Sequence, residues 1–229
     1  MRFPVKTSNG CDDQAIIHVV EDDASLRSAL EGLFDSMGLV CKTYKTASDF
    51  LDADLTDAHG CIVIDIRLPD MSGLELQAQL TQLQVHLPAV MMTGHGDIAM
   101  SVRAMKAGAV DFLPKPFRDQ DMLDAVISGI ERDRRRRDTE AELNSMRRRF
   151  YSLSGREQQV MKLVTAGKMN KQVAGDFGIS EITVKIHRGA AMKKMGARTL
   201  ADLVRMADLL EPKRPYSRAR VPPGFGGAF

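Results

Sequence analysis

Five side chains of the sequence are of types that could together accept and hold a phosphoryl group. They follow four separate apolar runs along the chain: Glu21, Asp22, Asp65, Thr93 and Lys115. Carboxylates that lie close together repel one another, and a hard divalent cation such as Mg²⁺ offsets that repulsion with oxygen ligands. A carboxylate can also act as a nucleophile and form an aspartyl-phosphate. We therefore expect Asp65 to accept a phosphoryl group, with Lys115 and Thr93 binding its oxygens.

The apolar runs that precede these residues are typical of strands buried on both faces. The strand candidates are residues 15–20, 39–44, 61–64, 88–92 and 109–113. Apolar residues at helical spacing fill the segments between and after them: 25–37, 47–53, 73–83, 97–107 and 119–130. This β-α alternation predicts an α/β fold with a doubly wound parallel sheet and helices on both faces. Ligands of such sheets bind beyond the carboxyl ends of the strands, where the five side chains would meet.

Residues 15–130 resemble the receiver domain of two-component response regulators. The matching segments are VVEDD (19–23), VIDIRLPDMSGLEL (63–76), MMTGHGD (91–97) and AMKAGAVDFLPKPF (104–117). Because these segments cover every strand end that carries a candidate residue, the resemblance extends over the whole predicted α/β domain.

This resemblance assigns a role to each candidate residue. It implies that Asp65 is the phosphoacceptor and that Lys115 contacts the phosphate. The implied ligands of Mg²⁺ are Glu21, Asp22, Asp65 and the backbone carbonyl of Arg67, and the implied switch pair is Thr93 and Phe112. The Lys115–Pro116 peptide bond is expected to be cis. One position departs from the family pattern: the first acidic residue, commonly Asp, is Glu21, whose longer side chain should still reach the metal.

Charge divides the chain into two parts. Residues 1–130 contain 19 acidic and 10 basic side chains, whereas residues 131–229 contain 22 basic and 11 acidic ones. Opposite net charges predict two domains with different partners, and nucleic acid is the expected partner of the basic part. Residues 131–150 contain no Pro or Gly, and their first dozen positions carry almost no apolar side chain. We expect them to form a solvated helical linker that continues the preceding helix.

The basic part reads as a small all-α domain of four helices over residues 151–210. The first helix spans 153–167, with Ser154 and Glu157 at the spacing of a capping box. A second helix (170–176) should be capped by Asn170, and Gly178 is suited to a left-handed C-cap. Ser180 should cap a third helix (181–195), and a fourth should span about 199–210. Two helices joined by a tight turn with glycine make a helix-turn-helix.

Residues 153–205 are similar to the LuxR-type helix-turn-helix, through LSGREQQVMKLVTAGKMNKQVAGDFGISEITVKIHRGAAMKKMGA. The similarity implies that Lys185 and Ile186 lie in the recognition helix and approach the bases. The implied phosphate contacts are Lys171, Thr183 and Arg188. Gly189 stands where relatives often carry a basic contact, which puts any transfer of sequence specificity in doubt.

A receiver joined to this output domain resembles the FixJ/NodW/StyR type of response regulator. The type implies phosphorylation of Asp65 by a cognate sensor histidine kinase, homodimer formation on phosphorylation, binding to promoter half-sites in DNA, and contact with RNA polymerase. No separate substrate, membrane span or export signal is indicated, so we expect a cytoplasmic transcription factor rather than an enzyme. The alternative is an interaction module whose DNA binding is constitutive or absent. Residues 1–14 and 211–229 are expected to be an N-terminal segment and a disordered tail.

Overall fold

The computed structural model describes residues 14–55, 58–94 and 98–210. The predicted disordered tail and nearly all of the N-terminal segment lie outside these residues. The chain divides into two compact units, Met1–Asp138 and Thr139–Phe229.

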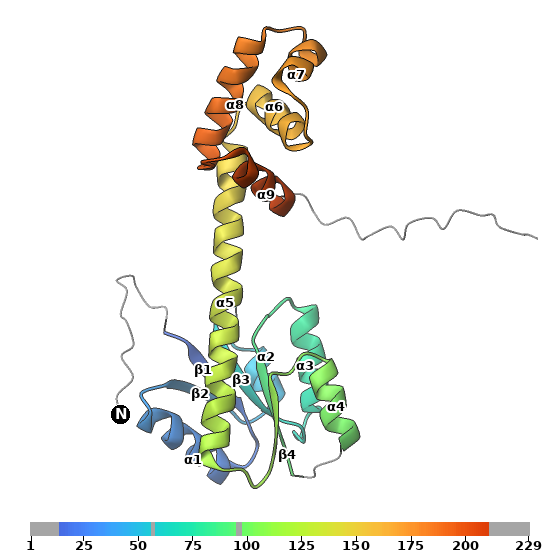
Figure 1. Cartoon of the computed structure of the whole chain (residues 1–229). Coiled ribbons are helices and arrows are strands. Elements are labelled where there is room, and N and C mark those ends of the chain that lie inside the picture. The colour runs from blue at the N-terminus through green and yellow to red at the C-terminus, as the bar shows by residue number, and fades with distance from the viewer. Residues whose placement is uncertain (1–13, 56–57, 95–97, 211–229) are drawn as a thin grey trace, which may run out of the picture. The chain divides into compact units, whose positions relative to one another are not determined.

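The first unit contains a parallel sheet of five strands in the order β2-β1-β3-β4-β5 (Figure 1). The strands are β1 (Ile16–Val20), β2 (Val40–Tyr44), β3 (Gly60–Asp65), β4 (Ala89–Thr93) and β5 (Asp111–Pro114). The helices are α1 (Ala24–Ser36), α2 (Ala47–Leu51), α3 (Gly73–Gln82), α4 (Ile98–Lys106) and α5 (Asp119–Tyr151). The predicted alternation of strands and helices is therefore confirmed.

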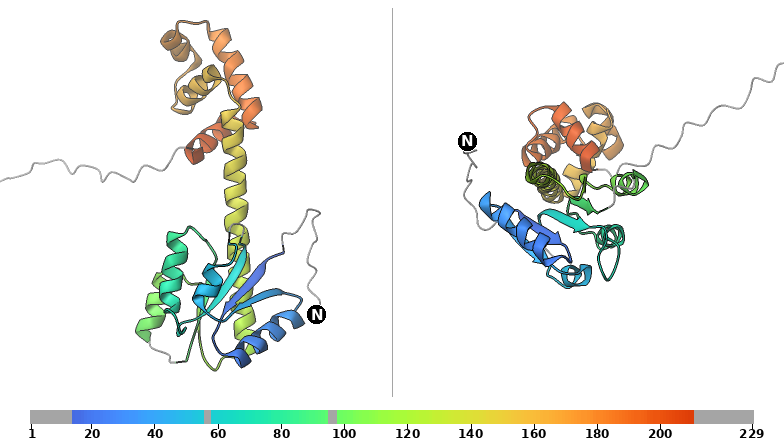
Figure 2. Two further views of the ribbon diagram at one scale, coloured as in Figure 1. Left: turned by 180° about the vertical axis from the view of Figure 1, so that it is seen from behind. Right: turned by 90° about the horizontal axis from the view of Figure 1, so that it is seen from below.

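Helices cover both faces of this sheet (Figures 1 and 2). A separate hydrophobic core lies on each face. On one face, Leu30 and Phe34 of α1 and Met122 and Val126 of α5 pack with side chains of β1 and β3. On the other face the core includes side chains of α2, α3 and α4. All six residues of β3 are buried, because this strand lies between β1 and β4 and is covered by helices on both faces.

Helix α5 is anchored to the sheet by a buried carboxylate. Asp133 is 2 % exposed, and its Oδ2 accepts a hydrogen bond of 2.9 Å from the backbone nitrogen of Gly60, the first residue of β3. Its Oδ1 lies 2.7 Å from Nη2 of Arg136. The expectation of a solvated helix in this segment is therefore wrong at Asp133. The strand begins with a buried N–H that needs an acceptor, and α5 supplies one.

Asp133→Ala should lower the free energy of unfolding of the first unit by about 2 kcal/mol, because the buried N–H of Gly60 loses its acceptor. Urea unfolding followed by circular dichroism measures the change. Glu131→Ala is the matched control, since Glu131 lies on the same helix and pairs with Arg135 at 3.2 Å on the exposed surface. That variant should lose less than about 0.5 kcal/mol. Equal losses in the two variants would contradict the role of Asp133.

The second unit contains α6 (Gly155–Thr165), α7 (Asn170–Phe177), α8 (Glu181–Met195) and α9 (Leu200–Leu210), together with the end of α5. Their core includes Val160, Val173, Val184, Met195 and Leu203, all without exposed surface. Met146 and Phe150 of α5 pack against the same core. The predicted four helices are confirmed.

The observed caps of these helices are those predicted from the sequence, except at the start of α7. Ser154 and Glu157 form the predicted capping box, and Ser180 accepts a hydrogen bond from the backbone nitrogen of Thr183. Gly178 has φ 63°, as its C-cap position requires. Asn170, however, is the first helical residue of α7 and not its cap.

The N-cap position of α7 is Met169, and Oε1 of Gln172 accepts from its backbone nitrogen at 2.8 Å. Gln172 reaches back from the first turn, so the chain enters the helix one residue earlier than the Asn pattern suggests. The amide oxygen of Asn170 instead faces Nη1 of Arg188 at 3.4 Å.

Candidate functional site

The carboxyl ends of the parallel strands bring the acidic residues of the first unit together. Glu21 and Asp22 directly follow β1, and Asp65 is the last residue of β3. Each of these three residues offers a carboxylate oxygen, and the three oxygens lie within 4.8 Å of one another. The register of β1 and β3, which pairs Val20 with Ile64, places the ends of the two strands side by side. The sheet therefore holds three carboxylates at one edge.

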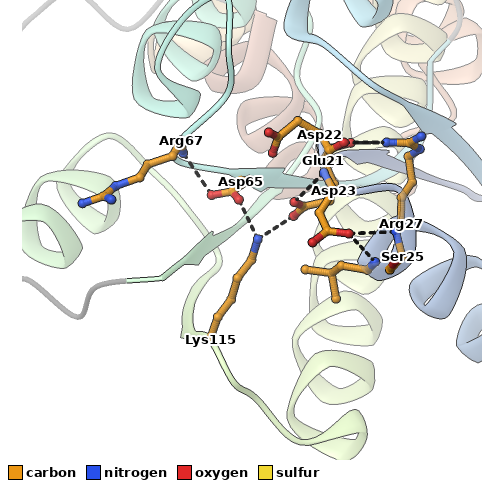
Figure 3. Close-up of polar contacts among 9 residues, drawn as sticks. Glu21, Asp22, Asp23, Ser25, Arg27, Asp65, Arg67 and Lys115 are labelled. Atoms are coloured by element: carbon orange, nitrogen blue, oxygen red, sulfur yellow. Dashed lines mark hydrogen bonds and ion pairs between the residues drawn. The ribbon is translucent and has the colours of Figure 1, made fainter.

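Lys115 lies between two of these carboxylates (Figure 3). Its Nζ donates to Oε2 of Glu21 at 2.6 Å and to Oδ2 of Asp65 at 2.5 Å. Burial by itself lowers the pKa of Lys115, but the hydrogen bonds to Asp65 and Glu21 outweigh burial and raise the pKa above its usual value. The ammonium is therefore held in its charged form at the center of the cluster.

One ammonium does not balance three carboxylates. Glu21 is 1 % exposed, and its burial raises the pKa of its carboxyl group even though Lys115 acts in the opposite direction. The nearby charge of Asp65 raises the pKa of Glu21 further. Closely spaced, partly buried carboxylates with excess negative charge fit a hard divalent cation with oxygen ligands. The carboxylate of Glu21 is one of the three that converge, so its extra methylene, compared with the usual Asp, does not remove it from the cluster.

Polar contacts hold the segments around the cluster in place. The backbone nitrogen of Arg67 donates to Oδ1 of Asp65 at 2.9 Å, which fixes the carboxylate and the loop after β3 to each other. Asp23, the third acidic residue after β1, does not join the cluster. It is the N-cap of α1, and its Oδ1 accepts from the backbone nitrogens of Ser25 and Leu26.

Two residues that the sequence analysis did not single out also support this edge. Nη1 of Arg27 donates to the backbone oxygens of Glu21 at 2.7 Å and of Asp22 at 3.3 Å, and so fixes the segment that carries both carboxylates. Asp70, in the loop after β3, accepts from the backbone nitrogen and the hydroxyl of Ser48 at the start of α2. Arg27 lies one turn into α1, a spacing that could have suggested its contact. Asp70 gives no such signal, because its partner is 22 positions away.

The residues expected to form the switch lie on β4, which is next to β3, and on β5, which pairs with β4. Thr93 is the last residue of β4 and is 1 % exposed, and its backbone oxygen accepts from the nitrogen of Lys115 at 2.6 Å. Phe112 is half-buried in β5 and packs against the core that includes side chains of α3 and α4. The Lys115–Pro116 bond is cis, as expected.

In the second unit, α7, the turn at Gly178 and α8 form the helix-turn-helix that the sequence predicts. Lys171, Lys185 and Ile186 are exposed. Thr183 and Arg188 are half-buried, and the hydroxyl of Thr183 lies 2.8 Å from that of Ser180. The five predicted contacts therefore differ in how freely they could reach DNA.

An ion pair between a buried carboxylate and an exposed lysine joins α6 to α8. Glu157 is 7 % exposed, and its Oε2 lies 2.7 Å from Nζ of Lys194. The hydrogen bond from Lys194, together with that from the backbone of Ser154, lowers the pKa of Glu157. The capping residue of one helix thus also orients the helix expected to meet DNA.

Among residues 14–55, 58–94 and 98–210, no helix is long and apolar enough to cross a membrane.

Comparisons with known proteins agree with both units. The family "Response regulator receiver domain" matches residues 17–127, and the family "Bacterial regulatory proteins, luxR family" matches residues 151–207. Nodulation protein W of Bradyrhizobium diazoefficiens is 54 % identical over 197 residues, which cover 86 % of this chain and 87 % of that protein. Response regulator protein TodT of Pseudomonas putida is 40 % identical, and the match covers 92 % of this chain and 93 % of TodT.

A solved structure is similar over both domains as well. The response regulator StyR has a TM-score of 0.76 and 47 % sequence identity, and the match covers 85 % of this chain and 98 % of StyR. The similarity of sequence and fold extends over most of both molecules. The chain therefore belongs to the two-component response regulators that join a receiver domain to a LuxR-type DNA-binding domain, and it is a regulator of transcription.

Proposed function

We propose that Mg²⁺-dependent phosphorylation of Asp65 by a sensor histidine kinase makes two copies of this protein pair through their receiver domains and bind promoter half-sites. The observation that carries the proposal is the position of Lys115, whose ammonium joins the carboxylates of Glu21 and Asp65. A charged donor at the nucleophile is what an incoming anionic phosphoryl group requires. Domain limits of 15–130 for the receiver, 131–150 for the helical linker and 151–210 for the DNA-binding domain are part of the proposal.

In the phosphorylation step, a carboxylate oxygen of Asp65 forms a bond to phosphorus while the bond between phosphorus and the histidine nitrogen of the kinase breaks. The histidine takes up a proton as it leaves. Bound Mg²⁺ would neutralise negative charge on the carboxylates and on the phosphoryl oxygens. Its ligands would be Glu21, Asp22, Asp65 and the backbone carbonyl of Arg67. Lys115 would exchange its hydrogen bond to Asp65 for one to a phosphoryl oxygen.

The switch would then act through Thr93 and Phe112. The hydroxyl of Thr93 would move toward the phosphate, and Phe112 would turn into the space that Thr93 vacates. The face formed by α4 and β5 would change, and two receivers would pair there. Val102 and Met105 support this choice, because these apolar side chains of α4 are 45 % and 47 % exposed. A ligand-like modification of this kind shifts a population between two states.

DNA binding follows from pairing. Two DNA-binding domains held together would bind two half-sites about one helical turn apart, or a multiple of that spacing. Lys185 and Ile186 would approach base edges, while Lys171, Thr183 and Arg188 would contact phosphates. RNA polymerase is the partner through which such a bound dimer would affect transcription.

The test compares wild type with Asp65→Asn, both treated with acetyl phosphate and Mg²⁺. Light scattering should show dimers for wild type and monomers for the variant, and EDTA should abolish the difference. Gel shifts at several salt concentrations should show preference for duplexes selected from a random library, with an affinity that falls steeply with salt. The proposal fails if Asp65→Asn dimerises as well as wild type. Equal binding to selected and random DNA would favour a protein-interaction module instead.

A further inference from the structure

We propose that Ile182 and Ile186 of α8 bind the methyl groups of thymine bases, and that Ile182 is a specificity-determining residue for the operator. The inference rests on the proposed DNA-binding function and goes further by naming the base that α8 selects. Ile182 is 69 % exposed and Ile186 is 65 % exposed. These two side chains are four positions apart, so they lie on the same face of the helix, one turn from each other.

Neither isoleucine belongs to the core of the second unit. The side chains of α8 that fill this core are Val184, Ala191 and Met195. They lie on a different face of the helix, and the core is complete without the two isoleucines. Their apolar surface stays in water in the free domain, so a surface that α8 meets gains binding free energy by covering both side chains.

Charge identifies that surface as DNA. Helix α8 carries four basic side chains (Lys185, Arg188, Lys193 and Lys194) and one acidic side chain (Glu181). Lys185 lies between the two isoleucines in the sequence and is exposed. An apolar pair on a basic helix fits a polyanion that also presents apolar groups. In the major groove of duplex DNA, the thymine methyl is the apolar group that a side chain can contact.

Of the polar residues in the first turns, Lys185 is exposed, whereas Thr183 and Arg188 contact other residues of the domain, so the two isoleucines share the reading of bases with Lys185. The hydroxyl of Thr183 is 2.8 Å from that of Ser180, and Arg188 is half-buried beside Asn170. A Cβ placed on Gly189 would meet no heavy atom within 4 Å, so nothing in the domain covers the helix there. The N-terminal residues of a recognition helix contact base edges, and Ile182 is the second residue of α8.

The spacing of the two isoleucines predicts the spacing of their thymines. Four residues span about 6 Å along a helix axis. Successive base pairs of DNA are about 3.4 Å apart. The two methyl groups should therefore lie within about two base-pair steps, on the same or on opposite strands.

The experiment uses the full-length protein with acetyl phosphate and Mg²⁺, and selects duplexes from a random library. A second library contains deoxyuridine in place of thymidine, which removes only the methyl group and keeps the hydrogen-bonding groups. Individual thymines of the selected duplex are then replaced by deoxyuridine one at a time. Loss of one buried methyl contact should weaken wild-type binding about fourfold.

Ile182→Ala should bind the thymidine duplex about fourfold or more weakly than wild type and should be insensitive, within about twofold, to deoxyuridine at one position. Ile186→Ala should show the same behaviour at a second position. The control is Leu209→Ala, because Leu209 is an exposed apolar residue of α9 (59 %) and should keep the full sensitivity to deoxyuridine at both positions. Circular dichroism checks that the variants fold.

The outcomes separate this inference from the proposed function. If wild type selects a defined operator but binds its deoxyuridine version equally well, the inference is wrong and the proposed function stands. The role of Ile182 is also wrong if Ile182→Ala keeps the wild-type sensitivity at every thymine. If neither library yields an enriched sequence, the proposed DNA-binding function fails and the inference fails with it.

Discussion

Replacing Lys115 with Met should make the stability of the receiver depend on Mg²⁺. The variant keeps most of the apolar stem of the side chain but removes the charge that joins Glu21 and Asp65. Removing one partner of a buried ion pair costs roughly 3–5 kcal/mol. The Lys115 side chain is 20 % exposed, so we expect a smaller loss of about 2–3 kcal/mol in the free energy of unfolding without divalent cations.

Magnesium should reverse this loss. The carboxylates of the variant have no ammonium to compete with the metal, so Mg²⁺ should bind the variant more tightly than it binds wild type. A ligand that binds only the folded state adds about 1.4 kcal/mol for each tenfold increase in concentration above its dissociation constant. Thermal unfolding at increasing MgCl₂ concentrations measures the effect, and the curves of variant and wild type should converge.

The same variant should fail to signal even when Mg²⁺ restores its stability. Without the ammonium, one contact to the phosphoryl oxygens is lost, so treatment with acetyl phosphate should no longer produce dimers. Lys45→Met is the matched control, since Lys45 is an exposed lysine before α2. Its unfolding free energy should stay within about 0.5 kcal/mol of wild type. A Lys115→Met protein with wild-type stability in EDTA would contradict the role of the ammonium.

The cluster at the strand ends was predictable because it follows from local pattern and one topological rule. Short apolar runs identified the strands, and parallel strands present their carboxyl ends at one edge. The sequence could therefore place Glu21, Asp65 and Lys115 together although they are up to 94 positions apart. The capping box at Ser154 was predictable for a similar reason, since both of its partners lie within one turn.

Contacts that depend on tertiary packing were not predictable. Asp133 lies in a charged segment that reads as solvated, yet it is buried because the N–H of Gly60, 73 positions earlier, requires an acceptor. Asp70 accepts hydrogen bonds from Ser48 in the first turn of α2, and no spacing rule relates the two residues. The error at Asn170 has another origin. A good capping residue predicts a helix start, but Gln172 provides a competing partner for the preceding residue. The hydrogen bond from Met169 to Gln172 therefore sets the start of α7, and the capping preference of Asn170 does not.

The exposure of Ile182 could not be predicted either, because its spacing from Ile186 places the two side chains on one side of a helix without showing whether that side is buried. Periodicity shows which residues share a face, and only the packed structure shows which face is buried. In α8 the buried face is occupied by Val184 and Met195, so the isoleucines are left for a partner.

Gly73→Ala should destabilise the receiver by about 3 kcal/mol, because the added methyl group has no room. A Cβ at Gly73 would lie 2.4 Å from the backbone oxygen of Asp65 and 2.8 Å from Cγ2 of Ile64. The backbone nitrogen of Gly73 also donates to the oxygen of Ile66 at 3.0 Å, which ties α3 to the end of β3. Neither the backbone of Asp65 nor the side chain of Ile64 can move away easily, because β3 is buried along its whole length.

The control is a glycine-to-alanine substitution at Gly32, which we expect to raise the stability of the receiver rather than lower it. Gly32 lies within α1, and a Cβ placed there meets no heavy atom within 4 Å. Alanine loses less conformational entropy than glycine when a helix forms, so Gly32→Ala should stabilise the receiver by about 0.5–1 kcal/mol. Urea unfolding of the two variants measures both changes. Equal stability of Gly73→Ala and Gly32→Ala would contradict the close packing at the end of β3.

The two variants should also differ in phosphorylation. The atom that the methyl group of Gly73→Ala would displace belongs to Asp65 itself, so the carboxylate should shift relative to Glu21 and Lys115. Phosphorylation by acetyl phosphate should therefore slow in Gly73→Ala at a temperature where the protein is still folded, and it should keep the wild-type rate in Gly32→Ala. If the folded Gly73→Ala protein is phosphorylated more slowly than wild type, the cause is a misplaced Asp65 carboxylate and not unfolding. A wild-type rate would contradict the role of Gly73 in positioning Asp65. In this way a residue with no side chain acts as a positioning residue for the proposed phosphoacceptor.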